Sequence, residues 1–497
     1  MKKFIKRMLS IGLSAFIVLG QAAVVTAEEG QNGAAQQNAD GNAQNAQPMT
    51  REEERQAGYA MPVDTNSLDG WPEGPSVYGS AAIVMDMNSG AVPYGKNINE
   101  KRYPASITKL LTALVALENS EPTDEVEITN DSIACLSPGD SHIGMTPGEI
   151  ITMDDALHAL LLASSNEVAH AIAESVGAKM GGNYDTFIQK MNERAEELGC
   201  TGSHWTNANG LHDADHYTTA HDMALIASAV YQYEEFRQIT QTLSYTIPPT
   251  NLVNESRTFQ QKHKMLWSGN KNYYEYATGG KTGYTDAART TLVTMADNGE
   301  LQLAAVVLYD FGQDAYVDTK AMFEYVFNNF SKVELSGQEK PEIVQSFTDP
   351  DAYVLPPDGV KFTDLDQEVT DEDAAAGTAV ISYTYEGQAV GSASVTLTAD
   401  YIQRLNGDSE QQIGDEDKNG QQESAGDPAD DSGLSVERMV MTGGAVLLGV
   451  MLVVLLIVVV RKVVQMRRRH KRRIKRQRTH KAAKAAASGR RRMRRRR

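Results

Sequence analysis

The sequence is poor in cysteine, with only Cys135 and Cys200 among 497 residues. A small secreted domain that depends on disulfides contains many more, so a disulfide-rich scaffold is excluded. Two cysteines at distant positions do not define a pair, and neither lies in a Cys and His signature of a cysteine enzyme. We therefore favour free buried thiols over a disulfide and expect no catalytic cysteine.

Histidine gives little support for a metal site. His212, His216 and His221 lie close together in the sequence, but they fall in a predicted loop and at the start of a predicted helix, Ala220 to Val230. A zinc protease places two histidines four residues apart on one helix, and this segment lacks that arrangement. We predict no metal site, and no motif in the sequence points to a cofactor.

Long hydrophobic runs are absent from most of the chain and occur near its two ends. At the start, basic residues precede the apolar run Leu9 to Leu19 and the small residues Val25-Thr26-Ala27. This order predicts an export signal over residues 1–27. Residues 28–65 are rich in Gln, Asn, Ala and Gly and have no periodic apolar pattern, which predicts a disordered spacer.

Acidic residues are absent from the end of the chain, where residues 461–497 hold 20 of the 47 Lys and Arg residues. An uncharged run from Val440 to Val460 precedes them and is long enough to span a bilayer, so we predict a transmembrane helix over residues 438–460. An acidic linker over residues 406–437 comes before it. The positive-inside rule places the basic tail in the cytoplasm. We expect a protein that crosses the cell membrane once, with its larger part outside.

The exported part has the opposite charge, because all 65 Asp and Glu residues lie between residues 28 and 460. This acidity argues against binding of nucleic acid or anionic wall polymers to the exported part. The basic tail is a candidate for contact with anionic lipid headgroups or RNA. The alternative is that the tail is a topology signal without a partner.

Three short motifs stand in one order along the chain: Ser106-Ile107-Thr108-Lys109, Ser164-Ser165-Asn166 and Lys281-Thr282-Gly283. Each motif alone is weak evidence, since such short patterns arise by chance in a chain of this size. The ordered set is specific, because enzymes that transfer acyl groups through an active-site serine combine these three motifs. The sequence therefore predicts an acyl-transfer enzyme.

The first motif has the spacing that a serine nucleophile and its base require. Lys109 lies three residues after Ser106, and on a helix these positions share one face. A lysine acts as a base only when burial or a nearby cation lowers its pKa, and Lys281 is a candidate for that cation. Leu110 and Leu114 recur at helical spacing and predict a buried helix, whose first N–H groups favour an oxyanion. The alternative is a solvated helix turn.

The other two motifs carry polar groups next to apolar segments. Ser164 and Asn166 lie between two predicted apolar helices, where the hydroxyl can pass a proton to a leaving amine and the amide can hold the substrate or order the base. Alone, they are typical of helix capping. Lys281 and Thr282 precede a predicted buried strand, Thr290 to Met295, and would face an anionic substrate group. The alternative is an ordinary strand entry with a turn glycine.

Four segments together resemble the serine D-alanyl-D-alanine carboxypeptidases, which are low-molecular-mass penicillin-binding proteins of the DD-peptidase and β-lactamase-like superfamily. The segments are Pro104-Ala105-Ser106-Ile107-Thr108-Lys109, Leu160-Leu161-Leu162-Ala163-Ser164-Ser165-Asn166, Asn207-Ala208-Asn209-Gly210-Leu211 and Lys281-Thr282-Gly283-Tyr284-Thr285-Asp286-Ala287-Ala288-Arg289. The resemblance covers about residues 66–335. It implies an α+β catalytic domain in which helices flank an antiparallel sheet.

The resemblance also implies roles for individual residues. The catalytic set would be Ser106, Lys109 and Ser164, and the substrate-binding set would be Asn166, Lys281, Thr282, Gly283 and Tyr284. Ser106 would be the acylated nucleophile and Lys109 its general base, with the N–H groups of Ser106 and Tyr284 as the oxyanion hole. The implied activity is removal of the terminal D-alanine from peptidoglycan stem pentapeptides, with β-lactams as acylating inhibitors and no cofactor.

The chain departs from the family at two places. The family usually shows an Asn-x-Asn-x-Leu-Leu type segment before the third motif, whereas this chain has Gln261-Lys262-His263-Lys264-Met265-Leu266. His263 replaces an amide there, and Lys262 is either a basic contact of the site or a surface lysine. Relatives are often held by an amphipathic C-terminal helix rather than by a complete membrane span.

A small β-rich domain is predicted over residues 336–405. Val380 to Tyr385 and Ser392 to Leu397 alternate between apolar and polar residues and are joined through Glu386-Gly387-Gln388, as expected for paired strands. This part resembles the β-rich C-terminal module of the same carboxypeptidases.

Two alternatives to a carboxypeptidase stay open. A β-lactamase shares the acylation step, but class A enzymes deacylate with a separate glutamate, and no glutamate of this chain can be placed by motif. A non-catalytic penicillin sensor would use the membrane span to pass a signal inward. A sensor normally carries a cytoplasmic effector domain, and residues 461–497 are too short for one.

Overall fold

The computed structural model describes residues 49–373 and 375–405. The chain divides into two compact units, residues 1–411 and 412–497, and the described residues belong to the first. Four predicted segments lie outside the described residues: the export signal 1–27, the linker 406–437, the membrane span 438–460 and the tail 461–497. Within the described ranges, no helix is long and apolar enough to cross a membrane.

A five-stranded antiparallel sheet forms the centre of the larger domain, in the order β2-β1-β9-β8-β7. Its strands are β1 (Ala81–Asp86), β2 (Tyr94–Lys96), β7 (Ala277–Thr285), β8 (Arg289–Asp297) and β9 (Gln302–Asp310). The early strand β1 pairs with the late strand β9, with Ile83 opposite Val306. The predicted buried strand Thr290 to Met295 is confirmed within β8, and the third motif lies on the edge strand β7.

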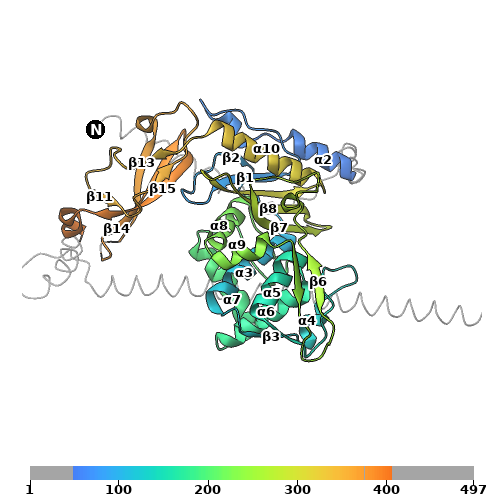
Figure 1. Ribbon diagram of the computed structural model, residues 1–497. Helices are drawn as coiled ribbons and strands as arrows, with labels where there is room; N and C mark the ends of the chain where they lie inside the picture. The colour runs from blue at the N-terminus through green and yellow to red at the C-terminus, as the bar shows by residue number, and fades with distance from the viewer. Residues whose placement is uncertain (1–48, 374, 406–497) are drawn as a thin grey trace, which may run out of the picture. The chain divides into compact units, whose positions relative to one another are not determined.

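Both faces of this sheet are buried, because alternate side chains of β1, β8 and β9 enter different hydrophobic cores. In β1, Ala81, Ile83 and Met85 belong to one core, whereas Ala82 and Val84 belong to the other. Figure 1 shows helices α2 and α10 beside the sheet on one face and the remaining helices on the other. This arrangement confirms the predicted α+β fold of an antiparallel sheet flanked by helices.

The helices and the small hairpins complete the larger domain. The helices are α2 (Arg51–Ala60), α3 (Lys109–Asn119), α4 (Asn130–Ala134), α5 (Met153–His158), α6 (Asn166–Lys179), α7 (Tyr184–Glu197), α8 (Ala220–Tyr231), α9 (Glu234–Gln241) and α10 (Asp314–Asn329). Two short hairpins pair β3 (Glu125–Glu127) with β4 (Ile150–Thr152) and β5 (Ser244–Ile247) with β6 (Arg257–Gln260). Helix α3 is central, and its residues from Lys109 to Ala116 are all buried.

Helix α2 corrects one prediction. It lies inside the predicted disordered spacer 28–65, so that prediction is wrong for residues 51–60. The helix starts with a capping box at Thr50, and the ion pair between Arg55 and Asp314 attaches it to α10. Polar contacts rather than an apolar stripe hold this helix, and hydrophobic periodicity therefore gave no signal for it.

The C-terminal part of the described chain is rich in β-strands, and the first of them begins at Val333, before the start of the domain predicted over residues 336–405. Its strands are β10 (Val333–Glu334), β11 (Val344–Phe347), β12 (Tyr353–Val354), β13 (Asp366–Asp373), β14 (Thr378–Tyr385) and β15 (Gln388–Leu397). The main sheet has the order β11-β15-β14-β13. Strands β14 and β15 form the predicted hairpin, in which Tyr385 pairs with Gln388 across the two turn residues Glu386 and Gly387. Both turn residues have positive φ, as a tight hairpin turn requires.

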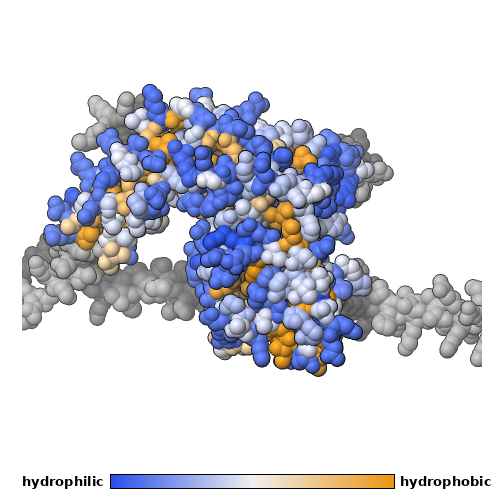
Figure 2. Space-filling model, viewed as in Figure 1, coloured by the Kyte–Doolittle hydropathy of each residue, from blue (hydrophilic) through white to orange (hydrophobic). Residues whose placement is uncertain are grey.

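The molecular face in Figure 2 is mostly hydrophilic, with hydrophobic residues in separate small groups. Large hydrophobic side chains that are exposed in the described chain are Met49, Tyr59, Leu243, Leu252, Tyr273, Tyr284 and Val317. Scattered residues of this kind are normal on the surface of a folded domain. Tyr284 is the member of this group that belongs to a predicted site motif.

Candidate active site

The first motif forms a tight turn at the start of the central helix. Residues Ala105–Thr108 form one turn of 3₁₀-helix that leads directly into α3. Lys109 Nζ lies 3.1 Å from Ser106 Oγ. The predicted approach of the amine to the hydroxyl is therefore confirmed, and the buried face of α3 anchors both residues.

Lys109 is fully buried and surrounded by polar groups. Its Nζ donates to Asn166 Oδ1 at 2.7 Å and to the backbone oxygen of Asn209 at 2.5 Å. Burial and, after it, the positive charge of Lys262 lower the pKa of Lys109 to about 7. A substantial fraction of this amine is therefore neutral near pH 7, as a base requires.

The cation that lowers the pKa of Lys109 differs from the predicted one. Lys281 was the candidate, but burial and the charge of Lys109 hold the pKa of Lys281 well below its usual range. The charge of Lys262 acts on Lys109 instead, because Lys262 keeps access to solvent at the pocket wall. Lys262 combines both alternatives, since it is exposed and also lines the pocket, where its Nζ donates to Ser141 Oγ at 2.9 Å.

The second motif lies at a sharp corner between two helices. Helix α5 continues as a π-helical turn over Ala159–Ala163, which ends at Ser164 with a left-handed φ of 60°. Ser165, not Ser164 or Asn166, caps the next helix, since its Oγ accepts from the N–H of Val168. Helix capping thus explains the middle residue of the motif and leaves the outer two for other contacts.

Those two residues connect the first motif with the third. Ser164 Oγ accepts from Lys281 Nζ at 2.9 Å. The amide oxygen of Asn166 holds Lys109, which is the ordering of the base that the sequence suggested. The three motifs therefore meet through the two buried lysines, Lys109 and Lys281.

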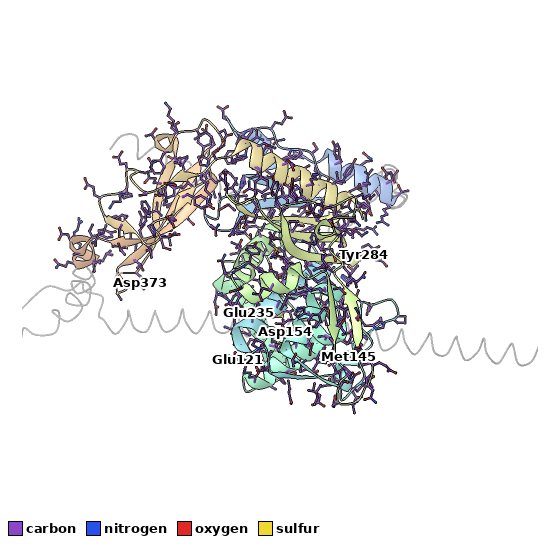
Figure 3. All side chains as sticks on the ribbon, viewed as in Figure 1. Glu121, Met145, Asp154, Glu235, Tyr284 and Asp373 are labelled. Carbon is purple, nitrogen blue, oxygen red and sulfur yellow. The ribbon has the colours of Figure 1, made fainter. Side chains whose placement is uncertain are left out.

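The third motif forms the adjacent strand edge. The glycine at position 283 permits close approach, because a Cβ there would lie 2.3 Å from Thr291 Oγ1 and 2.9 Å from the backbone nitrogen of Ser106. Lys281 Nζ also donates to the backbone oxygen of Thr282 at 2.8 Å. Tyr284 is 51% exposed, and Figure 3 marks it at the outer side of β7.

A pocket of about 520 Å³ brings the motifs together. It is lined by Ser106, Pro138, Gly139, Asp140, Ser141, Ser164, Asn166, Gly210, Leu211, Lys262, Thr282, Gly283, Tyr284, Thr285 and Asp286. Six of the eight predicted site residues line this pocket directly. Lys109 and Lys281 lie behind its wall, where they reach the pocket through Ser106 and Ser164.

Sequence reasoning missed several groups that shape this pocket. The backbone oxygen of Asn209 holds Lys109, and the loop from Pro138 to Ser141 forms part of the pocket wall. The N–H of Asn166 binds the backbone oxygen of Ser141, which fixes this loop to the second motif. Backbone groups and loops leave no side-chain pattern in a sequence. Of these groups, only Asn209 and Gly210 belong to a segment that the family resemblance pointed to.

His263 does not reach the pocket. It is fully buried behind β7, with Nε2 3.0 Å from Thr294 Oγ1 and 3.3 Å from the backbone oxygen of Val293. Burial lowers the pKa of His263 to about 4, so the ring is neutral near pH 7. His263 stands where the family usually has an amide side chain. The histidine therefore contacts the strands behind the third motif and not the pocket wall that would face a substrate.

The cysteines and the clustered histidines lie outside the pocket lining. Both cysteines are free thiols; Cys200 is buried, as expected, whereas Cys135 is only half-buried, and burial raises the pKa of both. His216 is buried and hydrogen-bonded through both ring nitrogens, to Thr108 and to Thr206. His216 thus has no free nitrogen for a metal ion.

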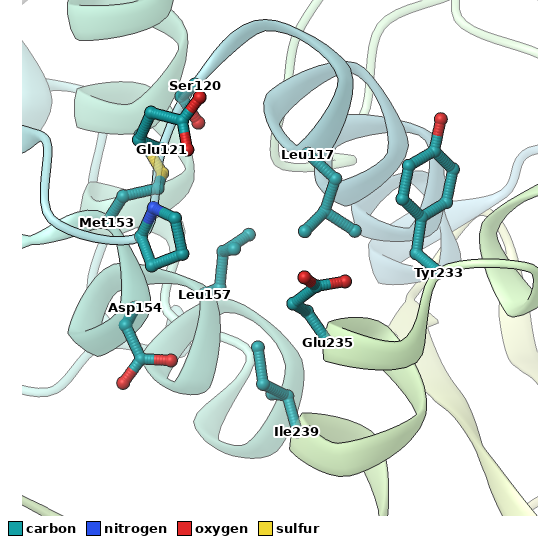
Figure 4. A pocket seen from close by; sticks show the side chains of 10 residues that line it. Leu117, Ser120, Glu121, Met153, Asp154, Leu157, Tyr233, Glu235 and Ile239 are labelled. Atoms are coloured by element: carbon teal, nitrogen blue, oxygen red, sulfur yellow. The ribbon is translucent and has the colours of Figure 1, made fainter.

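A second pocket, of about 230 Å³, lies between α3, α5 and α9 (Figure 4). Leu117, Leu157 and Ile239 supply apolar walls. The carboxylates of Glu121 and Asp154 lie at its edge. No residue of the three motifs lines it, and its lining has no pair of side chains like Ser106 and Lys109.

Comparison with known proteins gives consistent matches over one part of the chain. Residues 71–312 match the Peptidase_S11 family model, D-alanyl-D-alanine carboxypeptidase. The chain is 33% identical over 269 residues to "D-alanyl-D-alanine carboxypeptidase DacB2" of Mycobacterium tuberculosis, which covers 52% of this chain and 84% of the relative. It is 30% identical over 263 residues to "D-alanyl-D-alanine carboxypeptidase DacF" of Bacillus subtilis, which covers 50% of this chain.

The match spans 62% of the length of DacF, so it covers less than two thirds of that relative. Among solved structures, the chain is similar to the Streptomyces K15 DD-transpeptidase, with 25% identity and a TM-score of 0.47. That match covers 52% of this chain and all of the Streptomyces chain. The three motifs lie inside the range that the family model matches.

Proposed function

The chain belongs to the D-alanyl-D-alanine carboxypeptidase family, and on that premise we propose that it removes the terminal D-alanine from peptidoglycan stem peptides through an acyl-enzyme on Ser106. One observation carries this proposal. The buried amine of Lys109 lies 3.1 Å from the Oγ of Ser106, which lines a pocket that all three motifs shape. This is the relation of base to nucleophile that acyl transfer needs.

The contacts of Lys109 suit a neutral base. A neutral amine has two N–H donors and one lone pair. The donors have acceptors in Asn166 Oδ1 and the Asn209 backbone oxygen, so the lone pair is left for the hydroxyl proton of Ser106. Ser106 Oγ then attacks the carbonyl carbon of the penultimate D-alanine, and its proton passes to Lys109.

The remaining motif residues complete the reaction. The oxyanion would accept from the N–H groups of Ser106 and Tyr284, which the close packing of Gly283 on Ser106 brings near each other. Ser164, whose oxygen is held by Lys281, passes its proton to the leaving amine of D-alanine and is reprotonated with the proton that Lys109 took from Ser106. Lys109 is therefore neutral again in the acyl-enzyme. The terminal carboxylate of the substrate would bind beside Thr282 and restore positive charge on Lys281.

Water then releases the shortened peptide. Lys109 takes a proton from the water, the new hydroxide attacks the ester, and the proton returns to Ser106 Oγ as the bond breaks. β-Lactams would acylate the same serine and deacylate slowly. A β-lactamase would need a base poised for fast deacylation, but the carboxylate of Glu167 is fully buried and is occupied by Ser165 Oγ and the N–H of Ile143.

The location of the enzyme is a further part of the proposal. The export signal 1–27 and the span 438–460 would hold the catalytic domain outside the cell membrane, with the tail 461–497 in the cytoplasm. Fractionation of cells that express the full chain, and of cells that express a chain ending at residue 437, tests this. Membrane association of both chains alike would contradict an anchor over 438–460.

The test of activity is D-alanine release from diacetyl-lysyl-D-alanyl-D-alanine, with penicillin turnover measured in parallel. The wild-type chain should release D-alanine steadily and form a slowly decaying penicilloyl adduct, and Ser106→Ala should do neither. Rapid penicillin hydrolysis without D-alanine release would mean a β-lactamase. A stable adduct with neither activity would mean a sensor, and an adduct on Ser106→Ala would contradict the assignment of the nucleophile.

A further inference from the structure

The residue before the nucleophile has an unfavourable backbone conformation. Ala105 is buried and has a φ of 51°, in the left-handed region that residues with a β-carbon rarely occupy. Such a conformation persists only where the surroundings impose it. Because Ala105 opens the turn that carries Ser106, whatever holds Ala105 also sets the direction of the Ser106 N–H and Oγ.

Three contacts surround this backbone. The oxygen of Pro104 accepts from Thr291 Oγ1 at 2.8 Å. Gly210 packs so closely on Ala105 that a Cβ on Gly210 would lie 1.9 Å from the Ala105 oxygen. The same oxygen accepts from Thr108 Oγ1 at 2.8 Å. Thr108 therefore closes the turn from inside.

The hydroxyl of Thr108 has a second partner. Its proton is used toward the Ala105 oxygen, so in its 2.9 Å contact with His216 Nε2 the hydroxyl accepts and the ring donates. The other ring nitrogen, Nδ1, lies 3.0 Å from the backbone nitrogen of Thr206, which can only donate. The proton of a neutral His216 is thus assigned to Nε2.

The surroundings of His216 favour this neutral form. It is 2% exposed, packs edge-on against Trp205, and burial lowers its pKa to about 3. A second proton on Nδ1 would face the N–H of Thr206. The result is a relay of hydrogen bonds that all point one way: the Thr206 N–H donates to His216, His216 donates to Thr108, and Thr108 donates to the oxygen of Ala105. The side chains of His216 and Thr108 do not line the pocket.

We propose that His216 is a positioning residue for the acylation of Ser106, acting through Thr108 on the left-handed Ala105. The relay keeps the Ser106 N–H directed to the oxyanion position and Oγ within reach of Lys109. This inference rests on the proposed function. It gives a role to a histidine that a metal-site reading of the sequence would have misassigned.

The test compares matched variants of the full chain. Thr108→Val removes the hydroxyl and keeps the shape, whereas Thr108→Ser keeps the hydroxyl. His216→Leu removes both ring contacts, whereas His216→Gln places an N–H near the position of Nε2. Because a small misplacement of the nucleophile acts on the chemical step, Thr108→Val and His216→Leu should lower kcat about 100-fold with KM within about twofold.

The conservative variants Thr108→Ser and His216→Gln should stay within about tenfold of the wild-type kcat.

A second substitution, at Ala105, gives a sharper check. Glycine adopts positive φ without penalty, so Ala105→Gly combined with Thr108→Val should recover most of the lost kcat. Wild-type kcat in a folded Thr108→Val protein, or equal losses in Thr108→Val and Thr108→Ser, would overturn the proposal.

One readout does not depend on activity. Nitrogen-15 NMR of the His216 ring should show the neutral form with the proton on Nε2 from about pH 5 to about pH 8, the range in which an ordinary histidine titrates. A proton on Nδ1, or titration in that range, would overturn the relay. If the wild-type chain neither releases D-alanine nor binds penicillin, the proposed function fails while this measurement still decides the relay.

Discussion

At the scale of single residues, burial supplies the chemistry of the site. Lys109 has no exposed surface, and the loss of solvation together with the charge of Lys262 brings its pKa to about 7. The negative charge of Glu167 acts in the opposite direction and is the smaller effect. The pKa of Lys109 therefore depends first on burial and second on the cation at the pocket wall.

A pH profile tests this dependence. Below pH 7, Lys109 is protonated and cannot accept the proton of Ser106, so kcat/KM should rise about tenfold per pH unit and level off above about 7. Lys262→Met removes the cation that lowers the pKa, so the rising limb should move to higher pH. Penicillin acylation rates measured from pH 5 to 9 give the rising limb of the wild type and that of Lys262→Met.

Lys264→Met is the matched control for that profile. Lys264 lies two residues further along the same segment, and its amine stacks over the ring of Tyr316. Its charge is not among the causes of the Lys109 shift, so the limb should stay in place. A limb that stays fixed in Lys262→Met as well would contradict the role of that charge.

The adjacent serines of the second motif separate stability from activity. Ser165 Oγ caps α6 and donates to the buried carboxylate of Glu167 at 2.6 Å. Ser165→Ala should therefore lower the free energy of unfolding by about 1–3 kcal/mol, because a cap is lost and a buried oxygen loses its partner. Urea denaturation monitored by circular dichroism measures this loss.

Ser164→Ala should show the reverse behaviour. Its hydroxyl contacts Lys281 in the pocket and caps no helix, so D-alanine release should fall by about 100-fold or more, as for loss of a proton-transfer group. The free energy of unfolding should change by less than in Ser165→Ala. The assignment of the two serines is wrong if both variants lose the same activity and the same stability.

At the scale of elements, α2 shows how a polar helix docks without an apolar stripe. Gly58 packs so tightly on the chain that a Cβ there would lie 2.2 Å from the backbone oxygen of Tyr78. The backbone oxygen of Gly58 accepts from the buried amine of Lys96 at 2.8 Å. One glycine thus allows the close approach, and one buried lysine joins α2 to the sheet.

Gly58→Ala tests this docking. The added methyl group meets backbone rather than a movable side chain, so α2 must shift and the contact with Lys96 lengthens. We expect a loss of about 1–3 kcal/mol in the free energy of unfolding, the usual effect of overpacking. Faster proteolysis within residues 49–61 should accompany it.

Ala60→Ser on the same helix is the control for Gly58→Ala, because Ala60 is exposed. It should leave both the free energy of unfolding and the proteolysis rate close to wild type. Equal effects of the two substitutions would show that α2 does not dock through Gly58.

At the scale of the whole described chain, the hydrophobic core that contains Ala82 and Val84 of β1 extends from the sheet into the β-rich domain. Leu303 and Val307 of β9 belong to the same hydrophobic cluster as Ile381 and Val390 of that domain. Tyr353 adds a polar link, since its hydroxyl donates to the buried carboxylate of Asp86, at 2.9 Å from Oδ1. We therefore expect the two parts to unfold together.

Tyr353→Phe tests that cooperativity. The variant leaves a buried carboxylate with one partner fewer, which should lower the free energy of unfolding by about 1–3 kcal/mol. Because the core is shared, calorimetry should show one transition that moves to lower temperature as a whole. Two separate transitions, with only the smaller one displaced, would contradict a shared core.

Hydrophobic periodicity in the sequence predicted the elements that have a clear apolar pattern. Helix α3, strand β8 and the hairpin of β14 and β15 were found in this way. Helix α2 was not, because contacts with other segments, from Lys96 of β2 to Asp314 of α10, hold it instead of an apolar stripe. Local pattern carries no information on such partners.

The sequence alone determined which functional groups the proposed chemistry uses. The types and order of Ser106, Lys109, Ser164, Asn166 and Lys281 are readable without coordinates, because each proposed role requires a particular functional group. Tertiary structure alone decided which groups tune them. Lys262 as the cation, the Asn209 oxygen and the relay from His216 to Ala105 depend on distances between segments that the linear order of residues does not specify.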